Sequence, residues 1–156
     1  MNIAGIRKLL LRLERAVNKN QDQRSKYPDD PTKYVSPFLS LWRLRSYSVC
    51  RFIDSEADLD SALRELMPLA QVPILAYPEL VRSGSVARLV GLLSHENADI
   101  AIDVIDLLHE LTDEDNETDE EDDEEQRSAA VKTLIEALVR YVRQVARLLL
   151  TLTSNS

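Results

Sequence analysis

Apolar residues recur every three to four positions through most of the chain, a spacing that predicts amphipathic helices. In residues 3–18 the apolar stripe consists of Ile3, Ile6, Leu10, Leu13 and Val17. The opposite face of that helix is basic and carries Lys8, Arg12, Arg15 and Lys19. The same spacing predicts further helices over residues 58–71, 79–82, 86–93, 98–111 and 128–152. The pattern predicts an all-α chain.

Prolines and glycines mark the expected connections between these helices. Pro28 and Pro31 predict a turn-rich connector, because proline lacks an amide donor and restricts the residue before it. Pro73 and Pro78 are expected to bracket a short irregular link, with Pro78 in the first turn of the next helix. Gly84 is expected to end that helix in a left-handed conformation.

A short helix, a glycine turn, a helix, a polar turn and a long helix form the layout of one armadillo repeat. The fold class is therefore an incomplete armadillo/HEAT-type α-solenoid fragment with a disordered acidic loop. One repeat leaves the apolar ends of its stack uncovered, so a chain of this kind is marginally stable. Five segments are expected. They are an N-terminal helix with its connector (1–34), an atypical insert (35–53), the repeat (54–112), an acidic linker (113–127) and a truncated C-terminal helix (128–156).

Composition narrows the chemistry that the chain can support. Three glycines and 5% aromatic residues disfavour β-sandwiches and barrels, and Cys50 as the single cysteine excludes an intrachain disulfide. With only His95 and His109 besides, we expect no metal site and no cofactor, and no catalytic motif indicates an enzyme. No apolar run reaches the roughly 18 residues that span a bilayer. The Arg-rich start resembles a mitochondrial transit peptide, but Glu14 and the absence of serine depart from that signature.

The net charge of −8 comes from a single acidic run, residues 113–125, in which 11 of 13 residues are Asp or Glu. Self-repulsion and the lack of apolar residues predict a disordered linker. A calcium loop is the alternative, because carboxylates occupy its ligand positions at Asp113, Asp115, Glu117, Asp119, Glu121 and Glu124. Thr118, however, stands where that loop needs glycine. Thr118 is also a candidate phosphorylation site for an acid-directed kinase.

Four carboxylates share one narrow side of the long helix over residues 98–111: Asp99, Asp103, Asp106 and Glu110. The 100° rotation per residue places Ile100, Val104, Leu107, Leu108 and Leu111 on the buried side. In armadillo stacks the third helix lines the concave groove, where carboxylates would attract Lys- and Arg-rich peptides. These four residues, which we call the carboxylate ridge, are the candidate partner-binding site. The alternative is an ordinary solvated helix face.

Three segments carry a resemblance to a known family, the β-catenin-like nuclear armadillo proteins. They read GIRKLLLRLERAVNKNQDQRSKYPDDPTKY (5–34), LRELMPLAQVPILAYPELVRSGSVARLVGLLSHENADIAIDVIDLLHELTDED (63–115) and VKTLIEALV (131–139). The resemblance implies a truncated form of a long solenoid from its N-terminal region. Residues 35–53, which hold the only tryptophan and cysteine, interrupt the family pattern and, with the tail from Tyr141, are expected to be foreign to it.

The resemblance also implies a function. It points to a non-enzymatic nuclear scaffold associated with pre-mRNA splicing, through the spliceosome's nineteen complex and its Myb-domain subunit. The implied partners are splicing factors with basic segments of the nuclear-localisation type, with no membrane and no direct nucleic-acid contact; the oligomeric state stays open. Two alternatives remain: a helical RNA-binding module that uses Lys8, Arg12, Arg15 and Lys19, and a non-functional fragment of the scaffold.

Overall fold

The computed structural model describes residues 1–26, 54–113 and 121–154, and within these ranges it contains helices and turns but no strand. The all-α prediction is confirmed. The elements in chain order, besides a helix over residues 54–64, are α1 (Ile3–Lys26), the 3₁₀ helix η1 (Met67–Gln71), α3 (Pro73–Arg82), α4 (Ser85–Leu92), α5 (Ala98–Thr112) and α6 (Glu121–Ser154). No helix in the described ranges is long and apolar enough to cross a membrane.

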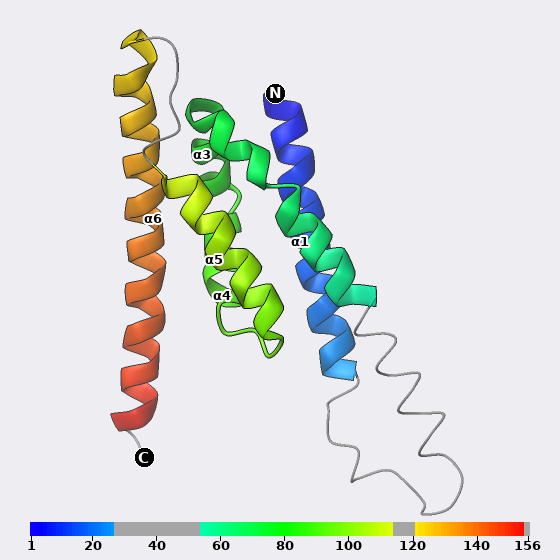
Figure 1. The fold of residues 1–156 in the computed structure, drawn as a ribbon. Helices are drawn as coiled ribbons and strands as arrows, with labels where there is room; N and C mark the ends of the chain where they lie inside the picture. Colours follow the sequence, from blue (N-terminus) through cyan, green and yellow to red (C-terminus); the bar gives the residue numbers. More distant parts are fainter. Residues whose placement is uncertain (27–53, 114–120, 155–156) are drawn as a thin grey trace, which may run out of the picture.

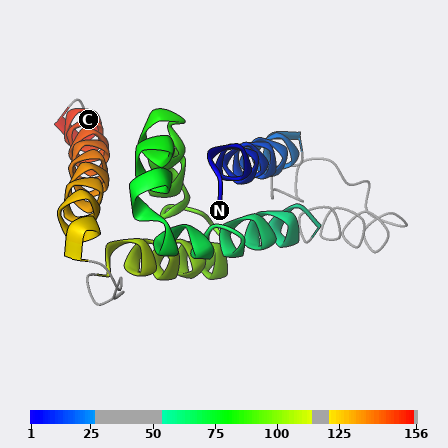
Figure 2. The same cartoon turned by 90° about the horizontal axis from the view of Figure 1, so that it is seen from above.

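The helices form two layers. Figure 2 shows α6, the α3–α4 pair and α1 side by side in one layer, with α5 and the helix of residues 54–64 across one side of it. α6 packs against α3 and α4, and α1 packs against the other side of the same pair. η1 brings the helix of residues 54–64 next to α5. The stack therefore ends in α1 on one side and in α6 on the other.

The core is formed largely by leucines and isoleucines from every described helix. The largest fully buried side chains are Ile6, Leu13, Leu59, Leu63, Leu66, Leu69, Leu80, Leu89, Ile100, Leu107, Leu111 and Leu134. Burial of each such side chain contributes about 1.5–3 kcal/mol. The stripe predicted for α1 is confirmed at Ile6, Leu10, Leu13 and Val17, whereas Ile3, at the start of the helix, is exposed.

The α3–α4 connection follows the sequence expectation in one respect and departs from it in another. Gly84 has a φ of 73°, the left-handed conformation that glycine adopts without strain, and it lies directly before α4. The predicted irregular link between Pro73 and Pro78 is wrong, because α3 begins at Pro73 and continues through Pro78. Pro73 suits the first helical position, where no intrahelical amide bond is lost.

α6 also begins earlier than predicted. The acidic linker was expected to include residues 121–127, but the helix starts at Glu121 rather than near Ser128. The physical reason is that the amide groups at a helix N-terminus carry partial positive charge, so a first turn with the sequence EDDE is favourable. The end of α6 extends past α4 and α5 (Figure 1).

Candidate functional site

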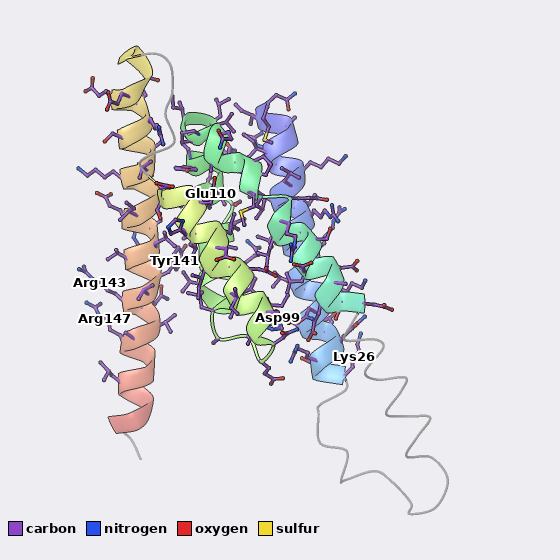
Figure 3. All side chains as sticks on the ribbon, in the orientation of Figure 1. Lys26, Asp99, Glu110, Tyr141, Arg143 and Arg147 are labelled. Carbon is purple, nitrogen blue, oxygen red and sulfur yellow. The ribbon has the colours of Figure 1, made fainter. Side chains whose placement is uncertain are left out.

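The carboxylate ridge lies along α5, with Asp99 near the start of the helix and Glu110 near its end (Figure 3). Asn97 fixes the start, because its side-chain oxygen accepts a hydrogen bond from the Asp99 amide at 3.0 Å. The four carboxylates are not equally accessible: Asp99 and Asp106 are exposed, whereas Asp103 and Glu110 are partly buried. Two carboxylates of the ridge are therefore accessible to a partner, and the other two are partly covered by the protein.

Asp103 is engaged by the neighbouring helix of residues 54–64. Arg64 donates a hydrogen bond to Asp60 at 2.7 Å, and its second nitrogen lies 3.6 Å from an Asp103 oxygen. Burial raises the pKa of Asp103, and the adjacent Asp60 carboxyl raises it further. The hydrogen bond from Arg64 lowers the pKa of Asp60. Asp103 thus links α5 to the helix of residues 54–64 in the same layer. The sequence did not predict this contact.

The C-terminal end of α5, beside Glu110, is held by two other helices. The Tyr77 hydroxyl of α3 donates a hydrogen bond to the Leu111 carbonyl at 2.6 Å. Arg127 of α6 donates to the Asp113 carbonyl at 3.3 Å. Both carbonyls lie at the helix end, where backbone acceptors lack intrahelical partners. These contacts fix the position of α5 against the rest of the stack.

Two isoleucines on the outside of α5 lie beside the exposed carboxylates. Ile102 and Ile105 are 52% and 55% exposed. Sequence reasoning assigned the buried side of this helix correctly, with Ile100, Val104, Leu107 and Leu111 buried, but missed the exposed pair. The signal was present, since the 100° rotation places Ile102 and Ile105 on the side away from the core. The exposed face of α5 therefore combines apolar side chains with negative charge.

Half of the basic residues predicted on one face of α1 form ion pairs within the protein. Arg12 forms an ion pair with Glu65 and Lys19 forms one with Asp58, both on the neighbouring helical segment. Arg12 also donates to the Ser61 hydroxyl at 3.1 Å. Lys8 and Arg15 remain exposed and make no ion pair with any described residue. Two of the four cations that an RNA would need are thus already neutralised by carboxylates.

A polar cluster ties α1 to the turn between α4 and α5. Arg24 forms ion pairs with Glu56 and Glu96, and the buried Asn20 donates to the Ser55 hydroxyl at 3.1 Å. His95 Nδ1 accepts from the Asn97 amide at 3.1 Å, and its Nε2 lies 3.1 Å from Asn20 Oδ1. A neutral ring with its proton on Nε2 satisfies both of these contacts. Within the described ranges no group of side chains is arranged to hold a metal ion.

The His95 cluster predicts a pH dependence of stability. Burial lowers the pKa of His95 below its ordinary value of 6.5, and the positive charge of Arg24 lowers it further. A hydrogen bond to the Asn97 backbone and the charges of Glu56 and Glu96 oppose this shift. A histidine with a lowered pKa favours the fold when neutral, so stability is lost as the pH falls below the unfolded value. We expect the urea midpoint to drop between about pH 7.5 and about pH 5.5, and to drop less in His95→Gln.

The exposed His109 supplies the control for this measurement. His109→Gln should leave the acid-induced drop in the urea midpoint as it is in the native chain. A drop of the same size in His95→Gln would show that other groups cause it.

Several expected sites lie outside the described residues. Thr118 and most of the possible calcium loop fall within residues 114–120, and the segment with Trp42 and Cys50 falls within residues 27–53. Phosphorylation at Thr118 stays a prediction.

The sequence model of a known family, described as catenin-beta-like, Arm-motif containing nuclear, matches residues 1–41 and 46–155. The match leaves out only residues 42–45 of the expected insert and includes the tail from Tyr141 to residue 155. Most of residues 35–53 and of the tail therefore lie within the matched residues.

Three individual relatives agree with this match. Beta-catenin-like protein 1 of Mus musculus is 37% identical over 94% of this chain, and that of Homo sapiens is 36% identical over 87%. The beta-catenin-like protein 1 homolog of Schizosaccharomyces pombe is 39% identical over 70%. The aligned regions span 21%, 20% and 16% of these relatives. The chain belongs to the catenin-beta-like family of nuclear proteins that contain armadillo motifs.

Proposed function

We propose that the chain is a non-enzymatic protein–protein interaction scaffold in pre-mRNA splicing that holds basic peptide segments of splicing factors along α5. Its partners would be proteins of the spliceosome and the nineteen complex that carry segments of the nuclear-localisation type. The observation that carries the proposal is the exposed face of α5, where Asp99 and Asp106 lie beside Ile102 and Ile105.

The chemistry of this face suits a peptide that is both basic and partly apolar. Lysine and arginine side chains pair with carboxylates through charge-assisted hydrogen bonds, and their aliphatic stems cover apolar surface. Asp99 and Asp106 are separated by a rise of about 10 Å along the helix. An extended peptide covers that distance in about three residues. Two basic residues about three positions apart, with an apolar residue between them, would therefore fit this face.

Charge reversal at the two exposed carboxylates tests the proposal. We expect Asp99→Lys/Asp106→Lys to weaken binding of a fluorescent Lys/Arg-rich peptide about tenfold, because attraction becomes repulsion. Fluorescence anisotropy measures the dissociation constant, and binding to the native chain should weaken as salt is raised.

Asp22→Lys/Glu136→Lys is the matched control, since it makes the same change in net charge at exposed residues of α1 and α6. Its affinity should stay near that of the native chain. Equal loss in both variants would mean that overall charge, rather than the α5 face, attracts the peptide. The link to splicing is tested by recovery of splicing proteins from nuclear extract with the native chain but not with Asp99→Lys/Asp106→Lys.

A further inference from the structure

A positive charge lies at the border of the exposed face of α5. Arg64, in the helix that precedes η1, is 68% exposed and contacts a carboxylate of each of two helices. Its Nε donates to Asp60 at 2.7 Å, and its Nη2 lies 3.6 Å from an Asp103 oxygen. Asp103 follows Asp99 by four positions and precedes Asp106 by three, so these carboxylates share one side of α5. Arg64 therefore places positive charge beside the carboxylates that are proposed to attract a basic peptide.

This border runs along the side of the stack rather than across one of its ends. Figure 2 shows α5 and the helix that contains Arg64 in one layer, with α1 and α6 at opposite ends of the other layer. Helices added beyond α1 or α6 would lengthen the stack without lying over this side. The surface is also formed by side chains of two helices.

The contact of Arg64 is exposed enough to be exchanged. The Asp60 and Asp103 side chains are 35% and 21% exposed, so both carboxylates are less exposed than the arginine that contacts them. Arg24, by contrast, is only 22% exposed in its two ion pairs. Ion pairs of exposed side chains contribute little to stability, because water and salt screen them and long side chains lose freedom on pairing. Another cation can therefore replace Arg64 at the same carboxylates at little cost.

We propose that Arg64 is an autoinhibitory contact, which occupies Asp60 and Asp103 in the free chain and is displaced by a lysine or arginine of a bound peptide. The inference rests on the proposed function of α5 and states how that site is regulated. A partner's basic side chain offers these carboxylates the same kind of cation as Arg64 does. A peptide that does not displace Arg64 has only Asp99 and Asp106 to pair with, and the guanidinium repels it. Arg64 therefore limits the affinity of α5 for strongly basic segments.

The spacing of the carboxylates indicates which peptide residues compete with Arg64. Asp103 lies about 6 Å along the helix axis from Asp99 and about 4.5 Å from Asp106. An extended peptide covers the longer of these distances in about two residues. A peptide whose first and fourth residues face Asp99 and Asp106 would therefore bring its second or third residue to Asp103, depending on its direction. Basic residues at these middle positions are the competitors.

The test compares two fluorescent peptides on the full chain by fluorescence anisotropy. Both have lysines at the first and fourth positions, and the two middle positions are alanines in one peptide and lysines in the other. We expect Arg64→Gln to bind the four-lysine peptide about fivefold more tightly than the native chain does, and the two-lysine peptide about twofold more tightly at most. Arg64→Lys keeps the positive charge, so its affinities should stay near those of the native chain.

Arg82→Gln is the matched control. Arg82 is also 68% exposed, and it pairs at 3.2 Å with Glu79 of its own helix, α3. The variant therefore loses the same charge and a similar ion pair away from α5, and its affinity for both peptides should equal that of the native chain. Circular dichroism and the urea midpoint check that each variant is folded.

The proposal is overturned if Arg64→Gln and the native chain bind the four-lysine peptide equally, or if Arg82→Gln or Arg64→Lys gains as much affinity as Arg64→Gln. The proposed function fails separately, because it predicts that Asp99→Lys/Asp106→Lys loses affinity for both peptides whatever the residue at position 64.

Discussion

Leu107→Ala is expected to lower the free energy of unfolding by about 3 kcal/mol. Leu107 is fully buried in α5, and truncation removes apolar contacts and leaves a cavity that the surrounding leucines fill only in part. Urea denaturation followed by circular dichroism at the helix bands measures the loss. The effect is large because α5 joins both layers of the stack, through η1 on one side and α4 and α6 on the other.

Ile105→Ala in the same helix is the control. Ile105 is more than half exposed, so its truncation should cost well under 1 kcal/mol. A similar cost for both variants would contradict the assignment of the two sides of α5. If Leu107→Ala is too unstable to measure, Leu107→Met tests the same position with a smaller expected cost, about 1 kcal/mol.

Tyr77→Phe is expected to cost about 2 kcal/mol. The hydroxyl of Tyr77 supplies a hydrogen bond to the Leu111 carbonyl, an acceptor at the end of α5 that is otherwise without a helical partner. Phenylalanine keeps the ring but leaves that buried carbonyl unsatisfied. Burial raises the pKa of Tyr77 to about 12, so the hydroxyl keeps its proton, and the bond, well above neutral pH. Thermal and urea unfolding should both show the loss.

Tyr141→Phe supplies the comparison, because Tyr141 is only partly buried and its hydroxyl makes no hydrogen bond with the described residues. Its cost should lie within about 0.5 kcal/mol of zero. Absorbance titration adds an independent readout, since Tyr77→Phe should remove a tyrosine that ionises near pH 12. Equal stability of Tyr77→Phe and the native chain would rule out the hydrogen bond as a significant contribution.

Periodicity predicted the inner side of each helix well, because burial repeats every three to four residues whatever the helix packs against. Ile6, Leu10 and Leu13 of α1 and Ile100, Val104 and Leu107 of α5 illustrate this. The left-handed backbone conformation of Gly84 was also predictable, because glycine adopts a positive φ without strain. Such local rules hold without knowledge of the neighbouring helices.

The same rules could not predict which polar residues face another helix. Asp103 was expected to be one of four equivalent carboxylates, but Arg64 and Asp60, about forty residues earlier in the sequence, engage it. The pairing of Arg12 with Glu65 was hidden for the same reason. Local pattern placed Pro78 in the first turn of a helix, whereas it lies inside α3, which packs between α1 and α6.

The ion pairs of α1 have a consequence for the order of folding. α1 is bound by partners far along the chain, through Arg7 to Glu79, Glu14 to Arg88 and Arg24 to Glu96. Contacts between distant residues form only after the intervening chain has closed, and closure costs entropy, whereas α3, α4 and α5 are neighbours in sequence. We therefore expect the α3–α5 unit to form early in folding and α1 to dock afterwards. Loss of these ion pairs should then accelerate unfolding more than it slows folding.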